Sequence, residues 1–334
     1  MVAAPLVDGY GRVHRDLRIS VTDRCNFRCT YCMPVEGMTW LPRSEVLSFE
    51  EIVRVAEVCV ETLGIESIRL TGGEPTVRAR LPLLVAKLAA LRTPADRPVD
   101  LAMTTNGVTL PSLAGELRDA GLRRVNVSLD TLRPDRFRDL TRRDQLDDVI
   151  AGIDAAVAAG LAPVKVNVVV MRGVNDDELV ELATFGRERG VTVRFIEWMP
   201  LDADQRWDAD AVVSQDEIVA AIGAVYPVDP VVRGSAPAER FTYRDGRGEI
   251  GVIPSVTRPF CASCDRIRLT ADGQLRSCLF SVDEVDLRGL MRSGGSDEDL
   301  VTAVRGCVAD KWAGHLIGQV TFIRPRRSMS QIGG

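Results

Sequence analysis

Residues 17–34 have the sequence LRISVTDRCNFRCTYCMP, in which a short run of alternating apolar and polar residues precedes three cysteines. This run, Leu17–Thr22, predicts a β-strand. Cys25, Cys29 and Cys32 follow in a C-x3-C-x2-C spacing, so one short loop can bring three thiolates to a single point. A structural zinc site takes four ligands, and a fourth is missing locally. A cubane iron–sulfur cluster also normally takes four cysteines, so three would leave one iron open to an exchangeable ligand.

The composition is that of an ordinary globular protein. The chain has 334 residues, of which 46% are hydrophobic and 27% charged, so it can bury a large core without disulfide or metal staples. Its 42 basic and 47 acidic residues give a net charge of −5, which disfavours a general nucleic-acid binder. Only Lys87, Lys165 and Lys311 are lysines, so the other 39 basic residues are arginines. A G+C-rich genome explains this bias, and a single arginine is therefore weak evidence of function.

The chain carries no membrane or secretion signal. No segment reaches the roughly 18 consecutive apolar residues of a membrane helix, and the first residues do not form a secretory signal. We therefore expect a cytoplasmic protein with no membrane partner. Its eight cysteines should then be thiols, which favours metal binding or catalysis over disulfides. Cys59 and Cys307 lie in apolar helical stripes, so we expect both to be buried in the core.

Strand-like and helix-like runs alternate six times over residues 17–226. This alternation predicts a parallel sheet with crossover helices. The strands are mostly apolar, as expected when both faces of a sheet are covered. Six units are too few for a closed eight-stranded barrel, so we expect an α/β fold with a partial (β/α)6 TIM-like barrel. Its chemistry should lie at the C-terminal ends of the strands, which are predicted at 17–22, 67–70, 101–104, 125–129, 164–170 and 191–198.

The pattern changes after residue 227, where Pro227, Pro230, Gly234 and Pro237 predict a linker. Three short strand-like stretches and two helices follow, and Asp272-Gly273 predicts a hairpin turn in the last stretch. We therefore expect a barrel domain at residues 1–227 and a C-terminal domain at residues 228–334. The tail from residue 324 is expected to be mobile.

A second cysteine triad lies in this C-terminal part. Cys261, Cys264 and Cys278 have a C-x2-C-x13-C spacing, again with three ligands. Two triads at opposite ends of the chain suggest two clusters, each with one open iron. A zinc ribbon that borrows a fourth ligand is the alternative, and His315 is the only nearby imidazole candidate.

The motifs resemble those of a known family. The first triad, with Tyr31 before its last cysteine, resembles the radical S-adenosylmethionine (SAM) enzymes, and the Thr71–Pro75 turn resembles their glycine-rich turn. Residues 18–34, residues 261–270 and the final Gly333-Gly334 resemble the GTP 3′,8-cyclase (MoaA) family of molybdenum cofactor biosynthesis. This resemblance implies a partial barrel with a C-terminal iron–sulfur subdomain. It also implies radical cyclisation of GTP, between ribose C3′ and guanine C8, to (8S)-3′,8-cyclo-7,8-dihydroguanosine 5′-triphosphate.

The resemblance further implies cofactors and contacts. It implies two [4Fe–4S] clusters, with SAM on the open iron of the first, and these cluster ligands: Cys25, Cys29, Cys32, Cys261, Cys264 and Cys278. It implies SAM contacts from Tyr31, Gly73, Ser128 and Met199. It implies GTP contacts from Arg18, Arg69, Thr104, Lys165, Arg266 and Arg268.

Physical reasons support several of these contacts. A triphosphate needs basic partners, and arginine suits bidentate contacts to phosphate. Arg266 and Arg268 flank Ile267, so strand alternation places both on one face. Lys165 lies in an apolar strand, where a charge needs a partner, so we expect its side chain to face the barrel interior.

The resemblance also implies an electron donor such as flavodoxin or ferredoxin, and a downstream cyclic pyranopterin monophosphate synthase. It implies a monomer or homodimer. We hypothesise that the Gly333-Gly334 tail inserts near the substrate. Two other functions remain open: a radical SAM enzyme whose second cluster serves a peptide or RNA, and a non-catalytic, zinc-stabilised interaction protein. Iron and zinc content would separate the last of these from an enzyme.

Overall fold

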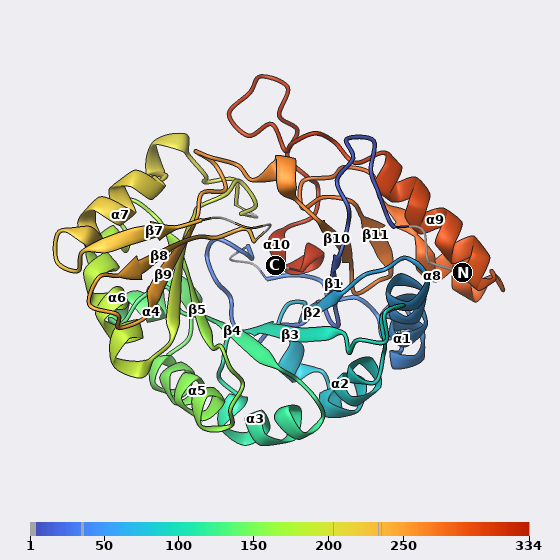
Figure 1. Cartoon of the computed structure of the whole chain (residues 1–334), viewed down its shortest axis with the longest axis horizontal. Helices are drawn as coiled ribbons and strands as arrows, with labels where there is room; N and C mark the ends of the chain where they lie inside the picture. Colours follow the sequence, from blue (N-terminus) through green and yellow to red (C-terminus); the bar gives the residue numbers. More distant parts are fainter. Residues whose placement is uncertain (1–4, 35–36, 203, 233, 235, 334) are drawn as a thin grey trace.

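The chain folds around one curled twelve-stranded sheet. The structure, a computed structural model, describes residues 5–34, 37–202, 204–232, 234 and 236–333. Six strands follow one another in chain order, and each pairs in parallel with the next. They curl around a central space with helices on the outside (Figure 1), which confirms the predicted partial (β/α)6 barrel. These strands are β1 (Asp16–Ser20), β2 (Ser67–Thr71), β3 (Asp100–Thr105), β4 (Arg124–Ser128), β5 (Lys165–Val170) and β6 (Thr192–Glu197).

The crossover helices cover the outer face of the sheet. The first begins at Ser48, which forms the predicted capping box with Glu51, and it continues into a π-helical turn at Val58–Thr62. Within the described residues, none of the helices is long and apolar enough to cross a bilayer. The barrel helices are α1 (Phe49–Glu57), α2 (Leu81–Ala89), α3 (Leu110–Asp119), α4 (Pro134–Thr141), α5 (Leu146–Ala158), α6 (Leu179–Arg189) and α7 (Gln215–Gly223).

The C-terminal part extends both edges of the same sheet. Strand β9 (Glu249–Ile253) pairs in parallel with β6, and β10 (Arg266–Leu269) pairs in parallel with β1. Antiparallel partners continue the sheet outward on each side. Among the described residues, no pairing joins the two outermost strands, so the barrel stays open. The remaining elements are β7 (Val228–Val231), β8 (Glu239–Tyr243), β11 (Gln274–Arg276), β12 (Val285–Asp286), α8 (Leu287–Arg292), α9 (Asp297–Ala309) and α10 (Met329–Ile332).

The linker predicted from the prolines is wrong over Val228–Val231, which forms β7. This strand lies at the edge of the sheet, with a neighbour on one side only. An edge strand tolerates Pro230 because its missing N–H removes no bond that the sheet needs.

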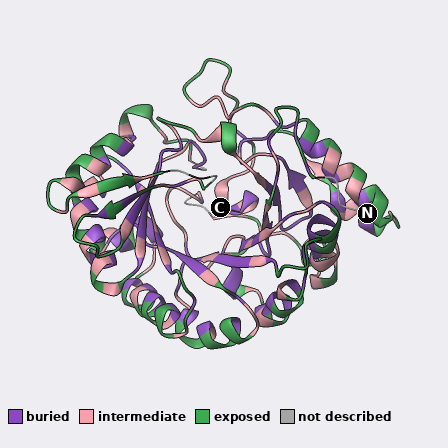
Figure 2. Cartoon of the chain, in the orientation of Figure 1, coloured by how far each residue is buried: buried purple, intermediate pink, exposed green. Residues whose placement is uncertain are grey.

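The expectation of strands that are apolar on both faces is also wrong. In β1, Leu17 and Ile19 belong to the hydrophobic core under the helices, so alternation turns Arg18 and Ser20 to the barrel interior. Buried residues concentrate on the strands and on the inner sides of the helices (Figure 2). The inner face of the sheet is polar because the sheet curls, so that the crossover helices cover only its outer face (Figure 1).

Two helical glycines test the packing of α5 against the loop after β3. A Cβ at Gly152 of α5 would overlap the carbonyl oxygen of Gly107, whereas a Cβ at Gly115 of α3 would meet nothing within 4 Å. We expect Gly152→Ala to lower the free energy of unfolding by about 1–3 kcal/mol, the usual cost of overpacking. Gly115→Ala should raise it by about 0.5–1 kcal/mol, because alanine is the better helix former. Guanidinium denaturation followed by circular dichroism measures both. Equal changes in the two variants would show that the loop can move away from α5.

Candidate active site

The two cysteine triads lie at opposite ends of the barrel. Cys25, Cys29 and Cys32 follow the C-terminal end of β1. Cys261 and Cys264 precede β10, which runs parallel to β1, so they lie at the N-terminal end of the strands. Cys278 follows β11, which runs antiparallel to β10, and therefore lies at that same N-terminal end. The inner face of the sheet therefore lies between the two triads.

The first triad is a set of buried thiols. All three cysteines are free and only partly accessible. Burial raises the pKa of Cys25 to about 12 and of Cys32 to about 11, and it also raises the pKa of Cys29 well above its ordinary value. Bound metal would offset this cost, since it stabilises the thiolate. Within the described residues, no three His, Cys, Asp or Glu side chains converge on a single metal ion. Three thiols in one loop match the donor set of a [4Fe–4S] cluster that keeps one iron open.

The glycine-rich turn after β2 packs against the loop that carries the first triad. The Gly73 amide donates to the Thr22 carbonyl at 2.8 Å, and the Glu74 amide donates to the Arg24 carbonyl at 2.8 Å. A Cβ at Gly73 would collide with the backbone carbonyls of Asp23 and Arg24. Only glycine therefore allows the two loops to approach this closely.

The Glu74 carboxylate holds this turn in place. It is buried, and it accepts hydrogen bonds from the Thr105 hydroxyl and the Asn106 backbone N–H, both at 2.6 Å. It also accepts one from the Thr76 hydroxyl at 2.7 Å. These donors come from the turn itself and from the end of β3. One carboxylate thus connects the ends of two neighbouring strands beside the triad.

Tyr31 contacts a residue that the sequence analysis did not assign. Its hydroxyl donates to Asp130 Oδ2 at 2.7 Å, and Asp130 Oδ1 accepts the Val169 amide at 2.8 Å. Burial raises the pKa of Asp130 to about 6. The sequence feature that pointed to Asp130 is its position just after β4, at the C-terminal end of the strands, where barrel enzymes carry their active sites. Ser128 and Met199 lie at this same end, at or just after the ends of β4 and β6.

The interior of the barrel is strongly cationic. The strand register places Arg18 between Arg268 on β10 and Arg69 on β2. Burial and the neighbouring arginines lower the pKa of the Arg18 guanidinium. The buried Nε atoms of Arg18 and Arg69 have no hydrogen-bond partner, and the nearest ion-pair partner of Arg18, Asp16, is 3.9 Å away. Buried donors that make no hydrogen bond are costly unless a ligand satisfies them.

The opposite wall adds more basic groups. Lys165 on β5 points inward as predicted, and burial with the nearby Arg194 and Arg124 lowers its pKa to about 8. The buried Arg194 was missed, although it alternates with Val193 and Phe195 on β6. It donates to Asn167 Oδ1 at 2.6 and 3.0 Å. Thr104 belongs to the same wall, since Asn126 Nδ2 donates to its hydroxyl at 3.3 Å.

Two cations surround one thiol of the second triad. The Arg266 guanidinium lies 3.5 Å from Cys264 Sγ, and the Lys311 ammonium lies 3.6 Å from it. Burial alone would raise the pKa of Cys264, but these two charges lower it to about 7. Lys311 was missed, although lysine is rare in this chain. A cavity of about 580 Å³, lined in part by Ser263 and Asp265, opens beside this triad.

The N-terminal hairpin fixes the loop of the second triad. Arg12 donates to the Cys261 carbonyl at 2.8 Å and to the Trp312 carbonyl at 2.6 Å, and it pairs with Asp8. His315 is engaged with the backbone through both ring nitrogens, at 2.9 Å from the Ser255 carbonyl and 3.1 Å from the Ile317 amide. Neither nitrogen is therefore free to complete a zinc site in this structure.

The C-terminal tail reaches the barrel interior. The expectation of a mobile tail is wrong for Met329–Gly333, where Met329–Ile332 forms α10 and Ile332 is buried. The Gly333 carbonyl accepts a hydrogen bond from Arg268 at 2.9 Å. A Cβ at Gly333 would lie 2.5 Å from Thr71 Oγ1, so a larger residue does not fit there. Gly334 lies outside the described residues.

Comparisons with known proteins agree with this geometry. The Radical SAM superfamily matches residues 19–186, and Molybdenum Cofactor Synthesis C matches residues 191–317. Among solved structures, Streptococcus suis SuiB bound to S-adenosylmethionine has a TM-score of 0.59 at 12% identity, over 94% of this chain and 77% of that one. The structure titled native anSMEcpe with bound AdoMet has a TM-score of 0.58 at 15% identity, over 86% and 79%. The fold and the family match place this chain among the radical SAM enzymes.

Curated relatives narrow the class. A GTP 3′,8-cyclase of Streptomyces coelicolor is 50% identical over 98% of this chain and 96% of its own length. A GTP 3′,8-cyclase of Rhodopirellula baltica is 51% identical over 98% and 92%. The chain belongs to the GTP 3′,8-cyclase family of molybdenum cofactor synthesis. This membership confirms the resemblance drawn from the cysteine motifs, together with the cofactors of that family, SAM and two [4Fe–4S] clusters.

Iron content tests the two triads separately. Replacing Cys25, Cys29 and Cys32 together by Ala should remove about half of the reconstituted iron and abolish formation of 5′-deoxyadenosine. Replacing Cys261, Cys264 and Cys278 should remove the other half and leave the first cluster assembled. Cys307→Ala is the matched control, because this thiol is buried outside both triads. Iron and sulfide assays after anaerobic reconstitution measure the result. Full iron content in either triple variant would contradict the cluster assignment.

Proposed function

We propose that the cationic barrel interior binds GTP between two [4Fe–4S] clusters and directs its cyclisation from ribose C3′ to guanine C8. The observation that supports this proposal is the position of the two cysteine triads at opposite ends of one barrel whose inner face carries buried basic side chains. Cys25, Cys29 and Cys32 would hold the cluster that binds SAM. Cys261, Cys264 and Cys278 would hold the second cluster at the other end.

At the first triad, the chain provides a preformed cradle for SAM. Gly73 has no side chain, so a ligand could approach its backbone closely. Glu74 fixes the turn through its hydrogen bonds to Thr76, Thr105 and Asn106. Tyr31 is held by Asp130, and Ser128 and Met199 complete the same rim. In this superfamily, SAM on a reduced cluster supplies the radical that abstracts hydrogen. The role of these residues is to hold SAM so that this reactive centre faces the interior.

Within the barrel, the basic side chains would hold the triphosphate. The Nε donors of Arg18 and Arg69, which make no hydrogen bond, support phosphate contacts. Arg268 and Thr104 lie on adjoining strands, and Lys165 lies further along the same sheet. Arg266 lies beside Cys264, so it would contact GTP near the second cluster. Anchoring GTP at both ends restricts the ribose to one position, and this restriction is what a selective hydrogen abstraction requires. The tail on Arg268 would close the remaining opening and help to exclude water.

The wider setting follows the family. We propose an electron donor such as flavodoxin or ferredoxin, a downstream cyclic pyranopterin monophosphate synthase, no nucleic-acid or membrane partner, and a monomer or homodimer in the cytoplasm. The division into a barrel at 1–227 and a C-terminal domain at 228–334 is also a proposal. This division separates two segments of the sequence and not two separate sheets, because strands of both segments belong to one sheet.

Product analysis tests the function directly. The anaerobically reconstituted chain, given GTP, SAM and a reductant, should form the 3′,8-cyclised dihydroguanosine triphosphate together with 5′-deoxyadenosine. Mass spectrometry with GTP deuterated at C3′ should show the deuterium in the deoxyadenosine. A second incubation with ATP in place of GTP is the control for substrate choice. Deoxyadenosine without any cyclised guanosine product would overturn the proposal.

The lowered pKa of Lys165 predicts how GTP binding depends on pH. A bound triphosphate should raise this pKa above its free value of about 8, so binding takes up a proton and weakens as pH rises past 8. The affinity should fall about fourfold between about pH 7 and about pH 8.5, which follows from one titrating group. Lys165→Arg should bind GTP with little pH dependence, because arginine stays charged. Lys165→Met should bind weakly at both pH values. Equilibrium dialysis with labelled GTP measures all three; an equal slope in Lys165→Arg would remove Lys165 from the binding site.

A further inference from the structure

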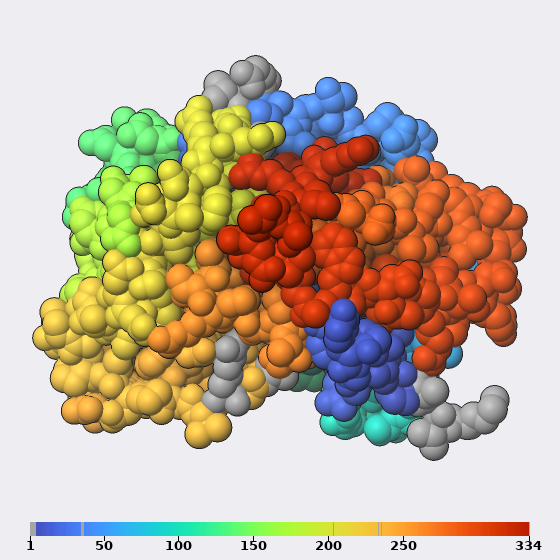
Figure 3. Space-filling model, turned by 90° about the horizontal axis from the view of Figure 1, so that it is seen from above, coloured from blue at the N-terminus to red at the C-terminus, as the bar shows by residue number. Residues whose placement is uncertain are grey.

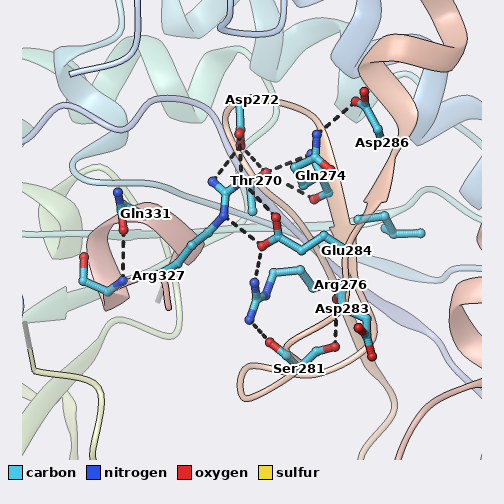
Figure 4. Close-up of polar contacts among 12 residues, drawn as sticks. Thr270, Asp272, Gln274, Arg276, Ser281, Asp283, Glu284, Asp286, Arg327 and Gln331 are labelled. Atoms are coloured by element: carbon cyan, nitrogen blue, oxygen red, sulfur yellow. Dashed lines mark hydrogen bonds and ion pairs between the residues drawn. The ribbon is translucent and has the colours of Figure 1, made fainter. Parts of the chain in front are cut away.

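The segment before α10 is held by an ion cluster outside the groups discussed so far. Arg327 donates to both carboxylate oxygens of Asp272, at 3.1 and 2.9 Å, and to Glu284 Oε2 at 2.9 Å. Its Nε also lies 2.8 Å from Glu284 Oε1. Figure 4 shows the Arg327 side chain reaching between these two carboxylates. One side chain of the tail is thus gripped by two acidic residues.

Both carboxylates of this cluster have partners other than Arg327. Asp272 lies in the β10–β11 turn and accepts the Thr270 hydroxyl at 2.6 Å. Glu284 pairs with Arg276, whose side chain is 2% exposed and also bonds the Ser281 carbonyl. These contacts fix both carboxylates in place (Figure 4), so little ordering is left for Arg327 to impose. The exposed side-chain fractions of Arg327, Asp272 and Glu284 are 24%, 12% and 20%, so water screens the cluster only in part.

The cluster is one residue away from the inserted helix. Ser328 is the N-cap of α10, and its amide bonds Gln331 Oε1 at 3.0 Å. The helix buries Ser330 and Ile332 and ends where Gly333 meets Arg268. Strand β10 and its turn therefore hold the tail twice, through Asp272 at the start of the helix and through Arg268 at its end. In the space-filling view, the C-terminal residues, in red, cover the centre of one face of the molecule (Figure 3).

We propose that Arg327 is a positioning residue that clamps the C-terminal tail into the barrel through Asp272 and Glu284. Bidentate contact to one carboxylate and a second contact to another fix both the distance and the direction of the chain. Because α10 has little more than one turn, it cannot hold itself in place. The clamp sets where Gly333 lies relative to Arg268, and hence how tightly the tail closes the cavity. The catalytic consequence rests on the proposed function, whereas the structural one does not.

Hydrogen–deuterium exchange on the reconstituted enzyme tests the clamp without reference to turnover. Arg327→Met keeps the length of the side chain and removes the charge, so amide exchange across residues 329–333 should accelerate on the order of tenfold. Arg326→Met is the matched control, because this neighbour is exposed, and its exchange should match the unmodified chain. Arg327→Lys should give an intermediate rate, since it keeps the charge and loses the fork. Equal exchange in Arg327→Met and Arg326→Met would overturn the clamp.

A second variant pair opens the clamp from its acidic side. Asp272→Asn with Glu284→Gln keeps the size of both side chains and should accelerate exchange in the same residues, with no change in the barrel helices. In turnover assays, Arg327→Met should lower kcat for cyclised GTP and raise the ratio of deoxyadenosine to cyclised product, with KM for GTP little changed. A higher exchange rate with an unchanged product ratio would show that the tail is clamped but does not position the reaction. Absence of any cyclised product in the unmodified enzyme would instead count against the proposed function and leave the exchange result standing.

Discussion

Burying several like charges inside one barrel is the constraint on which the rest of this structure depends. Arg18, Arg69, Arg194 and Lys165 all lie on the inner face of the barrel, and each has its pKa lowered by burial and by its neighbours. Such an arrangement costs stability in the free protein. A polyanionic substrate offsets that cost, because its phosphates attract each of the basic groups while the repulsion among those groups remains. The buried basic groups thus lower the folding stability of the free protein and raise its affinity for a polyanionic substrate.

The two ends of the cavity are built by different means. At the C-terminal ends of the strands, the three thiols and the glycine-rich turn would hold the cofactor. Glu74 fixes the turn by hydrogen bonds to the end of β3, and Asp130 fixes Tyr31. At the other end, Lys311 and Arg266 place positive charge beside Cys264, while Arg12 donates to the Cys261 carbonyl in the loop of the second triad. A cluster with thiolate ligands carries negative charge, so cations around it are the expected second layer. The tail contacts strand β10, because the Gly333 carbonyl accepts a hydrogen bond from Arg268. The same strand also carries Arg266.

Much of this site was predictable from the chain alone, because its signals are local. These signals depend on residues near one another in sequence. They are the spacing of Cys25, Cys29 and Cys32, the glycines after the second strand, and the two arginines on either side of Ile267. Arg194, Asp130 and Lys311 were missed for a common reason. Each acts through a neighbour distant in sequence: Asn167 for Arg194, Tyr31 for Asp130 and Cys264 for Lys311.

The sequence by itself determined the β/α alternation, the two cysteine triads and the family to which they belong, since periodicity and ligand spacing are properties of short segments. Only the tertiary structure decided that the C-terminal strands flank both edges of the barrel, which places the triads at opposite ends of the barrel. It also decided that the inner face of the sheet is polar, and that Arg327 reaches Asp272 and Glu284 to hold the tail. These features depend on which strands become neighbours and on how far the sheet curls. Both are settled by packing between distant segments, and no local pattern records them.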